Sequence, residues 1–157
     1  NCPLTGICAA FKENRQTDLP VMKEKAPIPH LVVTAGILRR NGRVLIAKRP
    51  SSGLLGGLWE FPGGKVESGE THAAALAREL QEELGIQASV AGLLGTYRHA
   101  YPHFSVTLHA YHVCAPELEI NPLQPSEVRW VSTAELADYP MGKIDRMISR
   151  DLLKEGT

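Results

Sequence analysis

The chain has 157 residues, of which 43% are hydrophobic and 22% charged, and its formal net charge is zero. This is the composition of one ordinary globular domain, without the basic field that marks nonspecific nucleic-acid binders. No apolar run reaches the length of a membrane span, and the chain does not open on a signal-peptide pattern. Three cysteines do not make a disulfide framework, so we expect a cytoplasmic protein without a membrane partner.

Residues 1–30 differ from the rest of the chain. They are polar and contain Pro20, Pro27 and Pro29, which predicts a short helical piece followed by an extended linker. Cys2 and Cys8 are the only cysteines in this stretch, and iron–sulfur clusters usually need four thiolates. We therefore expect no iron–sulfur cluster in this chain, and a folded domain over residues 31–157.

The folded part begins with a predicted β-hairpin. Asn41 and Gly42 separate two strand-like runs, LVVTAGILRR and RVLIAKR, which is a strong hairpin signal. A short strand over residues 58–61 then leads into Pro62-Gly63-Gly64, where glycines let the backbone approach a ligand closely.

Strands and helices alternate irregularly in the remainder. Strands are predicted at residues 88–98, 104–113 and 127–131, and a proline-containing loop at 115–126. Ser132 to Glu135 matches a capping box that opens a small helix, and apolar residues at i+4 spacing predict a closing helix over 144–154. Mixed strands with two or three helices indicate an α/β sandwich.

An acidic helix is the most informative stretch of the chain. Residues 73–84 are strong helix formers, and Glu79 has Glu82 and Glu83 as its i+3 and i+4 neighbours, so three carboxylates share one face. Carboxylates at this spacing repel one another. A hard divalent cation such as Mg²⁺ binds oxygen ligands, often beside substrate phosphates, and would turn this repulsion into attraction to the ion. A solvated acidic face is the alternative for so short a motif.

The wider pattern around this helix is G-x5-E-x7-R-E-U-x-E-E-x-G-U, in which U is apolar. The chain meets it at every defined position: Gly64, Glu70, Arg78, Glu79, Leu80, Glu82, Glu83, Gly85 and Ile86. The stretch resembles the Nudix box, the signature of hydrolases that act on nucleoside diphosphates linked to another moiety. The resemblance implies the Nudix fold, a mixed β-sheet between helices, and a requirement for Mg²⁺ or, in its place, Mn²⁺.

The same resemblance implies roles for individual residues. Glu79, Glu82 and Glu83 correspond to metal ligands, with the Gly63 carbonyl as a further ligand, and Glu70 to a supporting or second-metal group. Arg78 corresponds to the residue that orients Glu79. The general base stays open between two box residues and several glutamates outside the box: Glu82 or Glu83, against Glu117, Glu119 and Glu127.

Two further resemblances concern the substrate. LWEFPGGKVESGE resembles the MutT type, which converts 8-oxo-dGTP to 8-oxo-dGMP and pyrophosphate. GLLGGLWEFP, YRHAYPHFSVTLHAY and VRWVSTAELADYPMGKIDRMI resemble the C-terminal domain of MutY-type adenine DNA glycosylases, which reads 8-oxoguanine in duplex DNA. With the cysteine-containing N-terminal stretch, this second resemblance covers nearly the whole chain. The intact box favours the hydrolase; a lesion-recognition domain without hydrolysis, with duplex DNA as partner, is the alternative.

Seven residues are candidates for binding the nucleotide: Lys48, Arg49, Phe61, Lys65, Tyr101, His103 and Asp145. Lys48 and Arg49 lie at the end of a strand. Their side chains are about equally expected to bind a phosphate or simply to be exposed to solvent. Asp145 stands where both families usually have a base-binding asparagine; an ionised carboxylate only accepts hydrogen bonds, so Asp145 either reads N–H groups of a base or is a favourable helix N-terminal charge. His109 and His112 are expected on opposite faces of their strand.

Overall fold

The structure is a computed structural model that describes residues 27–115 and 120–156. Residues 1–26, with Cys2, Cys8 and most of the predicted linker, lie outside the described residues, and His30, predicted as the last linker residue, is the first residue of the first strand. The described elements follow one another in the predicted order: β1 His30–Arg40, β2 Arg43–Lys48, β3 Trp59–Glu60, α2 His72–Leu84, β4 Ser89–Ala100, β5 Ser105–Cys114, β6 Glu127–Ser132, the 3₁₀ helix η1 Glu135–Asp138 and α3 Lys143–Glu155.

A six-stranded mixed sheet runs through the described residues in the order β3-β2-β1-β5-β4, with β6 also paired to β2. The strands β1 and β5 are parallel, from the pair His30 and Ser105 to the pair Leu38 and Val113, whereas β4 is antiparallel to β5. The long β1 turns into β2 through Asn41 and Gly42, whose φ angles of 50° and 75° are those of a two-residue hairpin turn. The predicted hairpin and the α/β class are confirmed.

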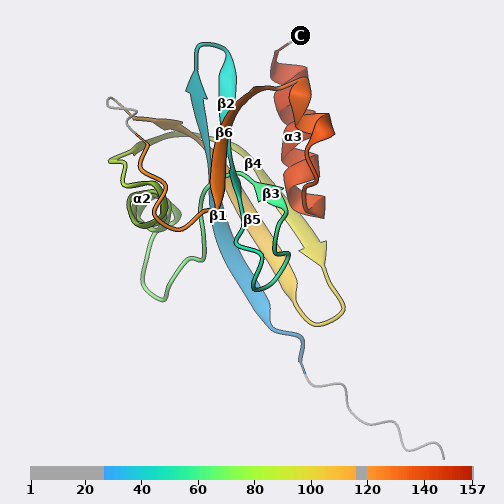
Figure 1. Ribbon diagram of the computed structural model, residues 1–157. Helices are drawn as coiled ribbons and strands as arrows, with labels where there is room; N and C mark the ends of the chain where they lie inside the picture. The colour runs from blue at the N-terminus through green and yellow to red at the C-terminus, as the bar shows by residue number, and fades with distance from the viewer. Residues whose placement is uncertain (1–26, 116–119, 157) are drawn as a thin grey trace, which may run out of the picture.

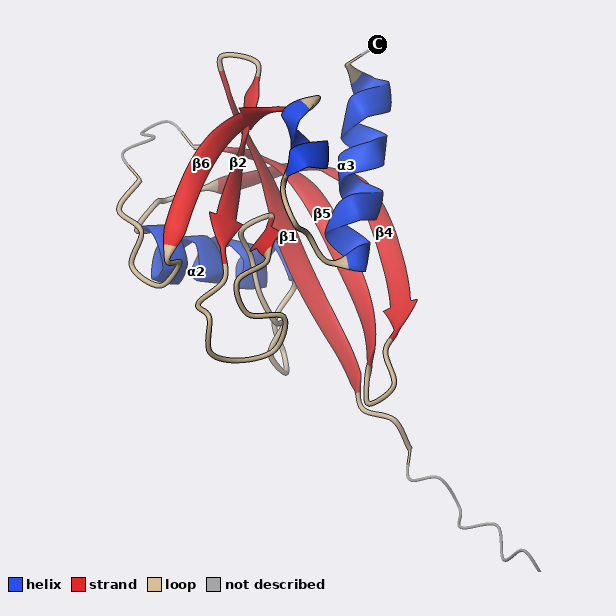
Figure 2. Cartoon of the chain, turned by 45° about the vertical axis from the view of Figure 1, so that its right-hand side comes forward, coloured by secondary structure: helices blue, strands red, loops and turns tan. Residues whose placement is uncertain are grey.

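The two long helices cover opposite faces of the sheet (Figures 1 and 2). Each has its own apolar core: Leu76, Leu80 and Leu84 of α2 on one side, and Ile144, Ile148 and Leu152 of α3 on the other. All but Ile144 are completely buried. None of the helices in the described part of the chain is both long and apolar enough to cross a membrane.

Both ends of α2 are fixed by hydrogen bonds. The Thr71 side chain accepts from the N–H of Ala74, and Gly85 closes the helix at φ 69°, in the left-handed conformation that favours glycine. The loop before β6 provides hydrogen-bond donors for the last carbonyls of the helix. The N–H of Leu123 donates to the backbone carbonyl oxygen of Glu83 at 2.8 Å. Hydrogen bonds therefore satisfy backbone groups at both ends of the acidic helix.

The predicted capping box is present and opens a 3₁₀ helix. The Ser132 N–H donates to the Glu135 carboxylate at 2.7 Å, and the Glu135 N–H donates back to the Ser132 hydroxyl at 3.4 Å. This turn directs the chain into α3, whose first turn contains Asp145. The capping box thus contributes to placing a candidate site residue.

A histidine pair joins α2 to the sheet on the far side from α3. The rings of His72 and His109 stack at 4.0 Å, and each has a hydroxyl partner, Tyr111 for His72 and Thr96 for His109. His112 instead pairs with Glu155 of α3, so the expected opposite orientation of His109 and His112 is confirmed. Burial, His72 and Arg98 lower the pKa of His109.

This lowered pKa predicts a pH-dependent stability. Because the folded state favours neutral His109, its stabilising contribution is fully present above the unfolded pKa near 6.5 and is lost as pH falls through the lower folded value. We expect His109→Gln to flatten the fall in melting temperature between about pH 7.5 and pH 5. Melting curves with an unchanged slope in the variant would contradict this assignment.

Candidate functional site

Two glycines bring the loop before α2 into contact with the sheet. The carbonyls of Pro62 and Gly64 accept from β1 N–H groups at 2.8 Å each. A Cβ on Gly63 would lie 2.2 Å from the Thr34 oxygen, and one on Gly64 would lie 2.3 Å from the carboxyl carbon of Glu79. At Gly63 a side chain would meet backbone atoms, whereas at Gly64 it would force the Glu79 carboxylate to move. The close approach at Gly64 places the Glu79 carboxylate directly over the loop.

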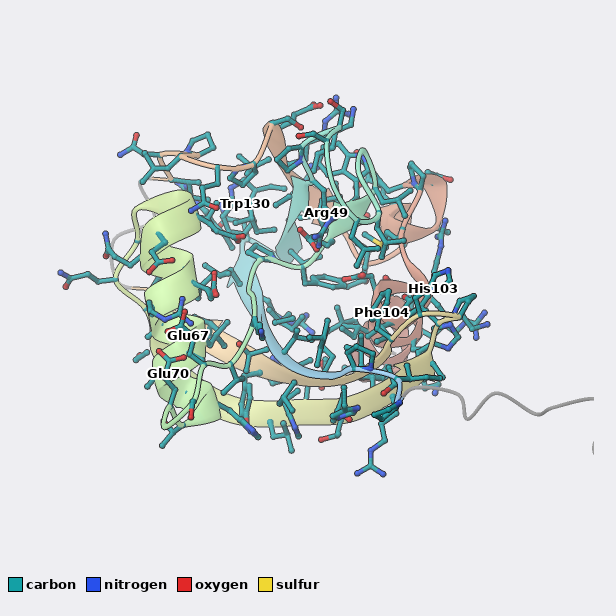
Figure 3. The ribbon with its side chains drawn as sticks, turned by 90° about the horizontal axis from the view of Figure 1, so that it is seen from below. Arg49, Glu67, Glu70, His103, Phe104 and Trp130 are labelled. Carbon is teal, nitrogen blue, oxygen red and sulfur yellow. The ribbon has the colours of Figure 1, made fainter. Side chains whose placement is uncertain are left out.

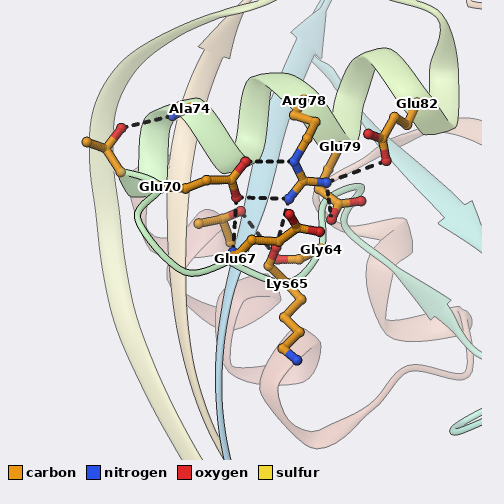
Figure 4. Close-up of polar contacts among 10 residues, drawn as sticks. Gly64, Lys65, Glu67, Glu70, Ala74, Arg78, Glu79 and Glu82 are labelled. Atoms are coloured by element: carbon orange, nitrogen blue, oxygen red, sulfur yellow. Dashed lines mark hydrogen bonds and ion pairs between the residues drawn. The ribbon is translucent and has the colours of Figure 1, made fainter.

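Arg78 is the centre of the polar network in this loop and helix (Figure 4). Its guanidinium donates to Glu70 at 2.8 and 3.0 Å, to Glu79 at 3.0 Å and, more weakly, to Glu82 at 3.4 Å. It also donates to the backbone oxygen of Lys65 at 3.1 Å. The predicted pairing of Arg78 with Glu79 is present, and one side chain links the loop to three carboxylates of the box.

Glu70 belongs to this clamp. Its two oxygens receive both arms of the Arg78 fork, and the N–H of Glu67 donates to it at 3.0 Å. Hydrogen bonds from Arg78, followed by that of Glu67, lower the pKa of Glu70 to about 2. In this geometry Glu70 points to Arg78 and does not line the groove described next.

A polar groove of about 430 Å³ lies between the loop, α2 and the end of β2. Acidic and basic side chains both line it: Glu60, Glu79 and Glu83 together with Lys48, Arg49 and Lys65. The pKa of Glu83 is raised to about 7 by burial and then by the charges of Glu60 and Glu79, against a backbone hydrogen bond from Gly63. The groove therefore holds carboxylates that repel one another.

That repulsion is what a divalent cation relieves, so the donor set fits Mg²⁺ or Mn²⁺. Among the described residues, no three His, Cys, Asp or Glu side chains lie close enough together to coordinate one metal ion. The carboxylates would therefore have to reorient when the cation binds. Glu82 is 48% exposed, does not line the groove and leans toward Arg78. Glu79 and Glu83 are the box carboxylates that face it.

A second pocket of about 170 Å³ adjoins the groove and shares Val33, Arg49, Glu60, Gly63 and Gly64 with it. Its walls are mostly apolar and aromatic, including Phe61 and the stacked pair Tyr101 and Phe104, whose centroids lie 4.6 Å apart. A flat apolar slot that opens directly onto a charged groove has the form of a nucleotide site, with the base in the slot and the phosphates in the groove.

Asp145 lies in the wall of this slot. Its Oδ1 accepts from the Phe61 N–H at 3.1 Å, and burial, followed by the charge of Glu60, raises its pKa to about 7. A carboxyl that is partly neutral at pH 7 carries a donor as well as acceptors. Asp145 thus lines the slot from the first turn of α3, a position that suits contact with a base and also places a carboxyl group at the helix N-terminus.

Glu60, which sequence reasoning missed, lines both the slot and the groove. It forms an ion pair with Arg49, and burial raises its pKa while Arg49 opposes that rise. Arg49 also donates to the Leu54 oxygen at 3.1 Å, so this predicted phosphate ligand is held by protein partners here. The sequence feature that could have indicated Glu60 is a single acidic residue within the apolar run LWEF. A strand of two residues has no periodicity from which the direction of the Glu60 side chain could be predicted.

The remaining candidates fall in different places. Lys48 and Lys65 line the groove, and Lys48 lies over the Trp59 ring at 5.8 Å. His103 is exposed in the turn between β4 and β5 and lines neither pocket, because the turn directs Phe104 inward in its place. Figure 3 shows His103 at the end of the molecule away from Glu67 and Glu70, which lie beside α2.

The general-base candidates outside the box are not brought to the groove. Glu127 forms an ion pair with Arg129 and lines neither pocket. Glu117 and Glu119 lie outside the described residues. Gln124 and Pro125, which sequence reasoning missed, complete the groove wall.

Comparison with known proteins agrees with this geometry. The family model described as NUDIX domain matches residues 33–150. The CTP pyrophosphohydrolase of Escherichia coli is 38% identical over 113 residues, 72% of this chain and 84% of that protein. The 8-oxo-dGTP diphosphatase of Proteus vulgaris is 45% identical over 84 residues, 53% of this chain and 75% of that protein.

Two more similarities complete the comparison. The adenine DNA glycosylase of Mus musculus is 35% identical over 68% of this chain, which spans only 21% of that protein. The solution structure of the E. coli ORF135 protein superposes with a TM-score of 0.71 at 33% identity, covering 82% of this chain and 94% of that one. The box, the fold and these relatives lead to one conclusion: the chain belongs to the Nudix hydrolase family.

Proposed function

We propose that this chain is a Mg²⁺-dependent pyrophosphohydrolase of an oxidised purine nucleoside triphosphate, converting 8-oxo-dGTP to 8-oxo-dGMP and pyrophosphate. The observation that carries the proposal is the continuity of the two pockets, in which an aromatic slot with Asp145 opens at Glu60 onto a groove containing Glu79 and Glu83. A base and its phosphates fit one on each side of that junction.

The groove provides the parts that this reaction needs. Bound Mg²⁺ would polarise the phosphates and lower the pKa of the attacking water. Glu79 and Glu83 would hold the ion, while Lys48 and Lys65, which also line the groove, would face the phosphate charge. Of the two candidate bases inside the box, Glu83 lines the groove and Glu82 does not, so Glu83 is the candidate base that the groove favours.

Two observations support a purine over a smaller base. The stacked Tyr101 and Phe104 rings and the buried Phe61 present a broad apolar surface, and Asp145 supplies a polar group at its edge. One relative is named for 8-oxo-dGTP and another for CTP, so both nucleotides belong in the substrate panel.

A second candidate function is recognition of 8-oxoguanine in DNA without hydrolysis. Similarity to a mouse adenine DNA glycosylase over 68% of this chain favours it. The same slot would then receive a base turned out of the duplex. Binding to duplexes with 8-oxoguanine:adenine and guanine:adenine pairs tests it at fixed salt, and equal affinities for the two would exclude it.

The decisive experiment measures pyrophosphate release from 8-oxo-dGTP, dGTP and CTP with Mg²⁺, with Mn²⁺ and with a chelator. We expect turnover that needs the cation and is fastest with 8-oxo-dGTP. Glu79→Gln serves as the inactive reference, because it removes a groove carboxylate while keeping the side-chain shape. Wild-type turnover no faster than that of Glu79→Gln on every nucleotide would rule out the hydrolase.

The mouth of the slot provides a further prediction. Leu54 lines the slot although it is 55% exposed, so a bound base would cover it. We expect Leu54→Asn to raise KM about 3- to 10-fold with little change in kcat, because apolar contact with the base is lost. Leu93, also 55% exposed but outside both pockets, is the matched control. Equal effects of Leu54→Asn and Leu93→Asn would contradict the placement of the base.

A further inference from the structure

Lys48, at the end of β2, lies between an aromatic ring and a carboxylate. The strand pairs with β3 on one side and with β6 on the other, so that Lys48 is directly opposite Trp59 and directly opposite Glu127. Opposite residues of an antiparallel pair project from the same face of the sheet, with Cβ atoms about 4.5–5.5 Å apart. The lysine side chain can therefore turn toward either neighbour.

Glu127 is the natural partner for a lysine, but another cation already holds it. Arg129 is two residues farther along β6, hence on the same face, and its Nε donates to a Glu127 oxygen at 2.6 Å. Lys48 instead lies with its Nζ 5.8 Å from the centroid of the Trp59 ring, and among the described residues it has no carboxylate partner. The ammonium group of Lys48 thus stays available to the groove that this residue lines.

Two aromatic rings support Arg129 in this position. Its Cζ lies 5.4 Å from the centroid of the Trp59 ring and 6.0 Å from that of Tyr139. The rings themselves form an edge-to-face pair with centroids 5.2 Å apart, and Trp59 is almost completely buried. A guanidinium stacks well on aromatic faces while its planar fork binds a carboxylate. The buried ring pair therefore favours the arginine that binds Glu127.

We propose that Arg129 is a positioning residue that keeps Glu127 from pairing with Lys48. The ammonium group of Lys48 is thereby left for the phosphate charge in the groove. Arg129 lines neither pocket, so its effect on the substrate passes through Lys48. The inference rests on the proposed nucleotide site and assigns a role in phosphate binding to a residue outside it.

The test replaces Arg129 by methionine, which removes the guanidinium and keeps an unbranched side chain. Glu127 then pairs with Lys48, and this exposed ion pair must open before a phosphate binds. For 8-oxo-dGTP with Mg²⁺ we expect KM to rise about 2- to 5-fold with kcat nearly unchanged, the scale of such a pair. The double variant Arg129→Met/Glu127→Gln should return KM to the wild-type value, because no carboxylate remains to compete.

Two further variants complete the comparison. Lys48→Gln should raise KM about 10-fold, the scale of a hydrogen bond to a charged group, and adding Arg129→Met should raise it no further. Arg39→Met removes an Arg–Glu ion pair outside both pockets and should keep the wild-type KM. An unchanged KM in Arg129→Met would overturn the proposal. So would a raised KM that Glu127→Gln does not restore, since it marks direct phosphate contact or a structural effect.

Two readouts do not depend on hydrolysis. Calorimetry with pyrophosphate and Mg²⁺ should show the same loss of affinity in Arg129→Met and the same recovery in the double variant. In NMR spectra, the side-chain protons of Lys48 should lose the ring-current shift from Trp59 in Arg129→Met and regain it in the double variant. If no nucleotide is hydrolysed, the proposed function fails while these measurements still decide the role of Arg129, which unchanged affinity and unchanged Lys48 signals would overturn.

Discussion

Replacing Glu83 by glutamine is expected to lower kcat at least about 100-fold, the scale seen when one group that stabilises a transition state is removed. Glu83 is the box carboxylate that lines the groove beside Glu60 and Glu79, and glutamine keeps its shape without its charge. The measurement is pyrophosphate release at saturating Mg²⁺. Activity within tenfold of the wild type would show that Glu83 is neither base nor essential ligand.

The same substitution should stabilise the metal-free protein. The folded pKa of Glu83 is about 7, above its ordinary value of 4.5, so its favourable contribution is complete below about pH 4.5 and is lost as pH rises through 7. Above that, the wild type holds an unfavourable buried charge that Glu83→Gln removes. We expect a gain on the order of 1–3 kcal/mol in unfolding free energy at pH 8 with chelator present.

Added Mg²⁺ separates this effect from a general change in stability. A cation that binds only the folded state raises the melting temperature, so Mg²⁺ should stabilise the wild type and act much less on Glu83→Gln. Glu155→Gln, which changes an exposed ion pair on α3, is the control and should respond to Mg²⁺ as the wild type does. A Glu83→Gln variant less stable than the wild type at pH 8 would contradict the electrostatic account.

The second large effect is expected from Gly64→Ala. The new Cβ would lie 2.3–2.6 Å from all three carboxyl atoms of Glu79, a distance that requires the carboxylate to move. That carboxylate is held in place by Arg78, so its displacement breaks the arrangement of the groove. We expect a loss in kcat similar to that of Glu79→Gln, about 100-fold, with a small change in melting temperature.

A double-mutant cycle tests the mechanism of this loss. If Gly64→Ala acts by moving Glu79, then the double variant Gly64→Ala/Glu79→Gln should be no slower than either single variant. Gly92→Ala is the matched control, because a Cβ at Gly92 meets no atom within 4 Å. Multiplying losses in the double variant would show that Gly64 acts through something other than Glu79.

Local spacing explains which predictions were reliable. The i+3 and i+4 neighbours of Glu79 follow from helix geometry alone, as do the helix boundaries, which the sequence predicted at 73–84 and the structure places at His72–Leu84. The Asn41-Gly42 turn and the Ser132 capping box are equally local, since a few adjacent residues satisfy their hydrogen bonds. Spacing alone did not show that only two of the three carboxylates on this helix face, Glu79 and Glu83, line the groove, while Glu82 lies toward Arg78.

Long-range contacts decided the rest of the site. The Phe61 N–H and the Asp145 carboxylate are 84 residues apart in sequence, and their hydrogen bond is what turns Asp145 into the wall of a slot. The raised pKa of Asp145 comes from burial and from Glu60, neither of which a residue pattern contains. His103 and Phe104 are neighbours, and the fold of one turn directs Phe104 rather than His103 to the slot.

The sequence by itself therefore determined the family, the acidic helix and the class of chemistry, because these depend on spacing within one helix and its flanking loops. Only the tertiary structure decided which carboxylates share the groove, and it brought in Glu60 as the link between groove and slot. The physical reason is that burial and charge coupling, which set how a carboxyl group acts, arise when β3, α2 and α3 pack around the sheet.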